Sequence, residues 1–178
     1  ITLNACQPIE KVNHIVFDNS QFVHFNILST SIEIIEIFEK KISDPYIGHT
    51  LEINPSERIF SWINDNFKPI GNENNFNVTI LDASITQTKF ENKEAKNFDE
   101  KSNYIYELFY LLEFSLFDDS GNLVASTLVE TSRSTTSGIY ISIQEIDNII
   151  DDLIYISLVD ISNETKKLLT NYMANYIL

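Results

Sequence analysis

A chain of 178 residues is long enough for one domain with a buried core, and 43% apolar residues, with 12% aromatic, exclude a disordered protein. Twelve basic residues against 26 acidic ones give a formal charge of −14, which excludes the basic surface that nucleic-acid binding requires. An anionic membrane surface repels the same charge, and no run of 18 apolar residues predicts a transmembrane helix, so membrane attachment would need an anchor.

The first residues contain the chain's one cysteine, in the stretch Leu3-Asn4-Ala5-Cys6. This stretch resembles the lipobox of bacterial lipoproteins, with Leu three places before Cys and a small residue directly before it. The sequence does not begin with Met, and we expect residues 1–5 to be the end of a signal peptide that is removed. The alternative is an ordinary thiol that happens to follow Ala5.

The lipobox resemblance implies that Cys6 carries the lipid. In that family the cysteine thiol is diacylated and the new amino group is often acylated too. Two or three acyl chains hold a protein stably at a membrane, whereas one chain holds it only marginally. Gln7 stands where the family's inner-membrane retention signal would place Asp, so the resemblance implies an outer-membrane protein that faces the periplasm.

The segment after Cys6 is predicted to be a short tether over residues 6–20, followed by one domain over residues 21–178. Residues 21–28 alternate apolar and polar side chains and predict a strand. Residues 32–42 fit either a helix face or a strand, and their Ile-rich composition favours a strand.

A helix is predicted to begin at Pro55. Asn54 can cap it, proline suits the first helical position, and Glu57 can reach back as in a capping box. Pro69 and Gly71 are expected to end it. Residues 77–88 then predict a strand with Thr79, Leu81, Ala83 and Ile85 on one side, and residues 89–102 an exposed loop.

The strongest pattern in the chain is a hairpin from residue 103 to residue 136. The even positions of its first strand are all large and apolar, which predicts one buried face: Tyr106, Leu108, Tyr110, Leu112, Phe114 and Leu116. The turn at residues 118–122 contains Gly121, which tolerates a positive φ. We expect this hairpin to form the centre of a sheet.

The C-terminal part is predicted to be helical from Ser142, which forms a second capping box with Glu145. Apolar residues recur at helical spacing to about residue 154 and again from about residue 164. The pattern fits either one long bent helix or two helices, with Ser162 as the cap of the second.

No motif in the chain predicts catalysis or a metal site, and we expect no cofactor. His14, His24 and His49 lack metal-ligand spacing, and no glycine-rich phosphate loop, nucleophile elbow or HExxH motif is present. The paired carboxylates at residues 118–119 and 151–152 fall in a turn and on a polar helix face, where solvation explains them. The hydroxyl-rich run over residues 131–138 could bind a sugar or phosphate, but the solvent-facing end of a strand that runs into a loop is the better interpretation.

The odd positions of the first hairpin strand form a candidate partner surface. They include three large apolar side chains, Phe109, Leu111 and Phe117, which would be exposed if helices covered only the even face. The alternative is that helices or loops cover both faces and that these residues belong to the core.

The element order predicts an α+β fold, a two-layer sandwich with a largely antiparallel sheet of about five strands and helices on one face. Behind a lipobox, this outline is similar to lipopolysaccharide-assembly lipoproteins and to the auxiliary lipoproteins of envelope ABC transporters. The Trp62 helix followed by Val78-Thr79-Ile80-Leu81-Asp82-Ala83-Ser84 also resembles an uncharacterised family of proteobacterial envelope lipoproteins.

These resemblances imply a lipid-anchored, non-catalytic accessory factor that binds an envelope protein or a lipid. The rival hypotheses are a binder of a small lipid or sugar, and a hydrolase without a recognisable motif. An exposed apolar groove would favour binding, and a buried cluster with a perturbed carboxylate or histidine would favour an enzyme.

Overall fold

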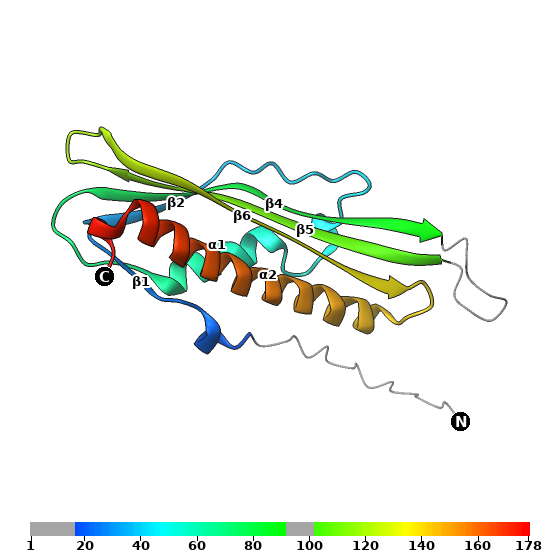
Figure 1. Ribbon diagram of the computed structural model, residues 1–178. Coiled ribbons are helices and arrows are strands. Elements are labelled where there is room, and N and C mark those ends of the chain that lie inside the picture. The colour runs from blue at the N-terminus through cyan, green and yellow to red at the C-terminus, as the bar shows by residue number, and fades with distance from the viewer. Residues whose placement is uncertain (1–16, 92–101) are drawn as a thin grey trace, which may run out of the picture.

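The computed structural model describes residues 17–91 and 102–178 (Figure 1). Cys6 and His14 therefore lie outside the described residues. Two helices pack on one face of a four-stranded sheet, which confirms the predicted α+β fold. The sheet order is β2 (Ser31–Glu36), β4 (Asn75–Glu91), β5 (Ser102–Phe117) and β6 (Leu123–Gly138), and the helices are α1 (Pro55–Asn66) and α2 (Ile143–Tyr172).

The predicted hairpin is present as β5 and β6. Every even position of β5 from Tyr106 to Leu116 is fully buried, because this face lies under the helices. In the turn, Asp118 accepts hydrogen bonds from the backbone N–H groups of Ser120 and Asn122, and Gly121 has a φ of 82°. β5 lies inside the sheet, whereas β6 is an edge strand, so only half of the hairpin is central.

The prediction for β4 was right about the strand and wrong about part of its buried face. Phe76, Val78 and Ile80 are buried at even positions, and the buried positions become odd at Ala83 and Ile85. A β-bulge between Ile80 and Asp82 causes the change, because one extra residue shifts the alternation of side chains by one. β4 also continues to Glu91, into the stretch predicted as loop, and residues 92–101 lie outside the described part.

The N-terminal strand is shorter than predicted and belongs to a second sheet. After a 3-10 turn, η1 (Asn19–Gln21), only β1 (Phe25–Ile27) is extended, and it pairs in parallel with β3 (Phe67–Pro69). The segment before β1 is held by α2, since the Ser162 hydroxyl accepts a hydrogen bond from the Val23 N–H at 3.0 Å. β3 was not predicted, and it directly follows α1.

β2 confirms a strand in the ambiguous segment, although it ends at Glu36. It runs parallel to β4, whereas the other pairs of the main sheet are antiparallel. The chain after β2 stays beside β4 without forming a long strand: the Ile47 N–H donates to the Ile85 carbonyl, and the Gln87 N–H donates to the Pro45 carbonyl. A 3-10 turn, η2 (Gly48–Thr50), leads from there toward α1.

Both helices begin as the sequence predicts. Asn54 caps α1 by accepting from the Glu57 N–H, although the Glu57 carboxylate returns to the Asn54 side-chain amide rather than to its backbone. Ser142 and Glu145 form a complete capping box on α2. The C-terminal pattern is resolved as one continuous helix, with Ser162 buried inside it, followed by η3 (Ala174–Tyr176).

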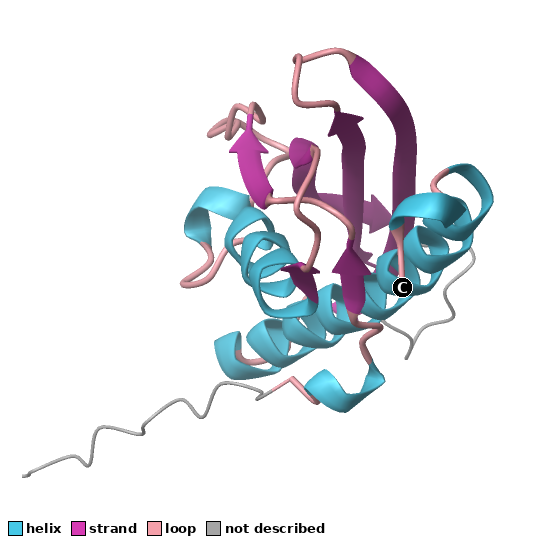
Figure 2. Ribbon diagram, turned by 90° about the vertical axis from the view of Figure 1, so that its left-hand side faces the viewer, coloured by secondary structure: helices cyan, strands magenta, loops and turns pink. Residues whose placement is uncertain are grey.

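The core lies between the helices and the sheet, as the end-on view shows (Figure 2). Aromatic rings join the two sheets and α1: Phe67 stacks on Phe25 at 4.5 Å and on Phe114 at 5.6 Å, and Trp62 meets Phe67 edge to face. Gly71 follows β3 where a side chain has no room, because a Cβ would lie 2.6 Å from the Leu28 carbonyl carbon.

Candidate functional site

The face of the main sheet opposite the helices is the candidate site, and we call it the open face. Strand register places Phe109, Leu111 and Phe117 on it, because they alternate with the fully buried even positions of β5. The three side chains are half-buried. The two helices pack on the other face, and the use of this face for binding is a proposal.

The three predicted residues do not form one continuous patch. Phe109 and Leu111 are neighbours on β5, but Glu113 and Ser115 separate them from Phe117, which lies about 20 Å further along the strand at 3.4 Å per residue. Phe117 pairs with Leu123 near the hairpin turn. The three predicted residues alone therefore do not make one apolar patch on the open face.

Neighbouring strands contribute further residues that the sequence reading missed. Leu128 of β6 lies opposite Glu113 and is 56% exposed, which is more than any of the three predicted residues. Ile35 of β2 lies in the same row, beside Thr79. Alternation along β6 could have identified Leu128, since it falls at an even position next to the buried Val129.

All charged side chains that the four strands place on the open face are carboxylates. Leu111, for example, is flanked by Asp82 on one side and Glu130 on the other. None of the lysine and arginine residues of these strands lies on this face, because Lys89 and Arg133 are in register with helix-facing positions of β5. The carboxylates are Glu33, Asp82, Glu107, Glu113 and Glu130.

One described cation lies close to this face. Lys41, in the segment after β2, donates a hydrogen bond to the Tyr46 hydroxyl at 2.9 Å and is attracted by Asp82. The hydrogen bond to Tyr46, helped by the charge of Asp82, raises the pKa of the Lys41 ammonium. This contact offsets part of the negative charge at one edge only.

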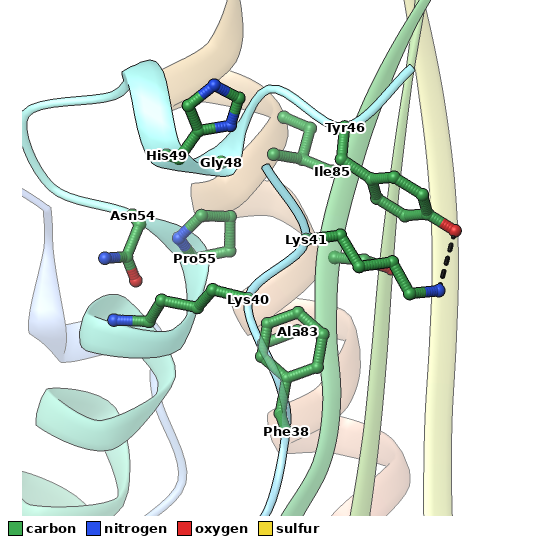
Figure 3. Close-up of a pocket in the computed structure, with 11 residues that line it drawn as sticks. Phe38, Lys40, Lys41, Tyr46, Gly48, His49, Asn54, Pro55, Ala83 and Ile85 are labelled. Carbon is green, nitrogen blue, oxygen red and sulfur yellow. Dashed lines mark hydrogen bonds between the residues drawn. The ribbon is translucent and has the colours of Figure 1, made fainter. Parts of the chain in front are cut away.

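A small pocket beside Lys41 is too small for a substrate (Figure 3). Its volume is about 20 Å³, which is room for roughly one water molecule. Its two lysines do not converge on an anion, since Lys41 points to Tyr46 while Lys40 extends toward α1 and lies 3.9 Å from Glu57.

A larger hollow of about 410 Å³ lies between α1 and the N-terminal segment. Aromatic, aliphatic and polar side chains line it, among them Phe17, Phe22, Leu158, Trp62 and Asn66. The indole N–H of Trp62 and the amide oxygen of Asn66 are buried without a hydrogen-bond partner among the described residues. The volume of the hollow fits the alternative that the protein binds a small ligand. The two unpaired polar atoms, however, are buried and not exposed to solvent.

The residues considered for chemistry have structural roles where they are described. Asp118 and Asp119 lie in the hairpin turn, and hydrogen bonds from Asn122 and Ser120 lower the pKa of Asp118. Asp151 pairs with Arg58, while Asp152 is exposed. His24 and His49 are exposed, and the hydroxyl-rich run belongs to β6 as predicted. Within residues 17–91 and 102–178, no three His, Cys, Asp or Glu side chains gather as metal ligands.

The core also contains one strongly perturbed group. Burial raises the pKa of the Tyr110 hydroxyl, which donates a hydrogen bond to the Pro55 carbonyl at 3.0 Å. This bond ties the centre of β5 to the start of α1. In the described part of the chain, no helix has the length and apolar character needed to cross a membrane.

Comparison with known proteins gives only distant likenesses. No family model matches the chain, and no curated protein matches its sequence. Among solved structures, the minor lipoprotein from Acinetobacter baumannii is 8% identical with a TM-score of 0.44, over 82% of this chain and 93% of that one. The rare lipoprotein B from Shewanella oneidensis is 10% identical with a TM-score of 0.39, over 80% of this chain and 98% of that one. Both are described as bacterial lipoproteins, but at these identities and TM-scores neither likeness assigns a function to this chain.

Proposed function

We propose that this protein is a lipid-anchored accessory factor of a bacterial envelope that binds a protein partner through its open face, without catalysis. Cys6 carries the lipid, the anchor lies in the outer membrane, and the body faces the periplasm. The partner presents an apolar surface surrounded by lysine or arginine side chains.

The observation that supports this proposal is the composition of the open face. Phe109, Leu111 and Leu128 alternate with carboxylates and hydroxyl side chains, and the four strands place no basic side chain there. Specific interfaces combine an apolar centre with complementary charges at the rim. A basic protein surface satisfies both requirements, whereas an anionic membrane or a nucleic acid would be repelled.

The anchor is tested by metabolic labelling of the precursor. Expressed with its full signal peptide in a bacterium that processes lipoproteins, the protein should incorporate labelled fatty acid, because a lipobox cysteine is acylated after cleavage. Cys6→Ser should abolish the label and release the protein from the membrane fraction. Unlabelled, soluble wild-type protein would contradict the anchor while leaving the open face untested.

The binding surface is tested by Phe109→Ser. Removing this half-buried ring should weaken partner capture by about tenfold or more, since central aromatic side chains dominate binding energies. The free energy of unfolding should fall by only about 1 kcal/mol, because part of the ring is already in water. Calorimetry gives the stability, and affinity capture from labelled envelopes gives the binding.

The matched control is Phe60→Ser, which makes the same chemical change at an exposed phenylalanine on α1. It should leave capture unchanged. If Phe109→Ser unfolds the isolated domain, that side of the sheet is ordinary core and the partner surface lies elsewhere.

A further inference from the structure

The outer edge of β6 is the longest unpaired strand edge in the described part of the chain. β6 has sixteen residues, of which only Val129 and Ser137 are buried. Between Val124 and Thr136, the backbone groups that point away from β5 have no hydrogen-bond partner among the described residues. α2 packs on the helix-facing side of this strand and leaves the ladder of N–H and C=O groups without a neighbouring strand (Figure 1).

The other edge of the sheet is protected in the usual ways. β2 has six residues and carries Glu33 and Glu36, and short charged edge strands discourage pairing with another chain. β6 is not short: it has sixteen residues and no proline, and its two charged residues, Glu130 and Arg133, are spread over that greater length. Its single bulge lies at its start, between the partners of Leu116 and Phe117, so residues 125–138 form a regular ladder.

We propose that the edge of β6 is a second binding site, which takes an extended basic segment of a partner protein as a fifth strand of the main sheet. Backbone hydrogen bonds to the unpaired edge would supply affinity, and alternate side chains of the added strand would supply specificity. Exposed Leu128 would pack beside those side chains on the open face.

The charge of the edge favours a basic occupant. Arg133 is already neutralised, because its guanidinium forms two hydrogen bonds with the Asp160 carboxylate of α2. Glu130 has no ion-pair partner among the described residues and projects from the middle of the edge strand. The charge that a new strand would meet is therefore negative.

The same charge disfavours a second copy of this chain. Each copy carries a formal charge of −14, so pairing two β6 edges would bring two strongly acidic bodies together. The antiparallel register centred on Glu130 would also place two carboxylates opposite each other, which destabilises a strand pair.

The site can be tested with the full-length chain and a synthetic peptide of alternating lysine and valine, about nine residues long. Fluorescence anisotropy gives the dissociation constant, and hydrogen exchange gives the position. Binding should slow exchange at alternate amides of β6, since successive N–H groups point to opposite sides of the strand. The control peptide has the same sequence with N-methyl groups on alternate residues, which preserves charge and removes the ladder; it should bind at least about tenfold more weakly.

Two variants at adjacent positions, Thr131→Pro and Ser132→Pro, test whether the peptide binds at the outer edge of β6. They differ because successive N–H groups of a strand point to opposite sides. One of them removes a hydrogen bond to β5 and should lower the melting temperature more. The other removes an outward N–H, should nearly keep the wild-type melting temperature, and should weaken peptide binding by about tenfold. The peptide should still bind Phe109→Ser, so failure of the edge site and failure of the open face can be told apart.

Four results would overturn the inference: absence of binding, equal binding of the N-methylated peptide, protection elsewhere than β6, or unchanged affinity in the proline variant that keeps its stability. If sedimentation shows that the chain alone forms a dimer, and the same β6 amides are protected in it, the occupant of the edge is a second copy of the chain and the proposed basic segment is wrong.

Discussion

Leu112→Ala should lower the free energy of unfolding by roughly 2–5 kcal/mol. Leu112 is fully buried at the middle of β5, the strand that lies between β4 and β6. Truncation removes packing beside its register partners Ile80 and Val129 on the helix-facing side of the sheet. It also leaves a cavity that the surrounding strands cannot fill by moving. Chemical denaturation followed by circular dichroism measures the loss, and Phe114→Ala should behave similarly because it removes a ring from the aromatic cluster.

Asp119→Ala is the control for this prediction. Asp119 lies in the exposed hairpin turn and makes one hydrogen bond, accepted from the Asn74 N–H at 3.1 Å. Its loss should cost well under about 1 kcal/mol, because exposed hydrogen bonds exchange readily with water. If Leu112→Ala and Asp119→Ala shift the denaturation midpoint equally, β5 is not the centre of the core.

Asp151→Ala should cost roughly 2–4 kcal/mol. Asp151 and Arg58 join α2 to α1 at 3.2 Å, and each side chain is only 15% exposed. Arg58 also lies over the Phe17 ring, and its Nε has no partner among the described residues. Removing the carboxylate therefore leaves a largely buried cation without its counter-charge, which is the costly way to break a buried pair.

The comparison for Asp151 is its neighbour Asp152, which is exposed on the same helix. Asp152→Ala removes an identical charge at the same level of α2 and should change stability by less than about 0.5 kcal/mol. If thermal unfolding shows the same loss of stability for both substitutions, the ion pair between the helices contributes no more than the removal of one negative charge anywhere on α2.

Much of the fold could be predicted because local patterns there agree with the packing. The even positions of β5 all face one continuous core, so period-two alternation identified the buried face. The two N-caps depend on residues within three positions of each other, so Asn54 and Ser142 could be read directly.

The features that were missed depend on distant contacts. The bulge next to Asp82 reverses the buried face of β4, and no residue in that stretch marks it. β3 is extended because Phe67 pairs with Phe25 across more than forty residues of chain. The first strand is shorter than predicted, and the Val23 N–H before it donates to the Ser162 hydroxyl of α2, a contact that alternation along the strand does not encode.

The candidate site was predicted in part. Alternation placed Phe109, Leu111 and Phe117 on one face, which the register supports, but it could not show that carboxylates of β4 and β6 flank Leu111. The unpaired edge of β6 became visible only once strand order was known, and the register with β5 then placed Leu128 on the open face. Sequence alone predicts which residues of one strand share a face. Which residues lie beside them on the sheet depends on the neighbouring strands and their register.

Site-specific photocrosslinking in living cells tests the open face most directly. A photoreactive residue at Leu128, which is 56% exposed on that face, is compared with one at Asn148, which is exposed on α2. We predict a discrete adduct with one envelope protein at position 128, absent at position 148 and reduced when Phe109→Ser is added. Mass spectrometry should place the crosslink in a region of that protein where apolar and basic side chains adjoin. Equal labelling at both positions, or no adduct at position 128, would contradict the proposal that the open face binds a protein partner.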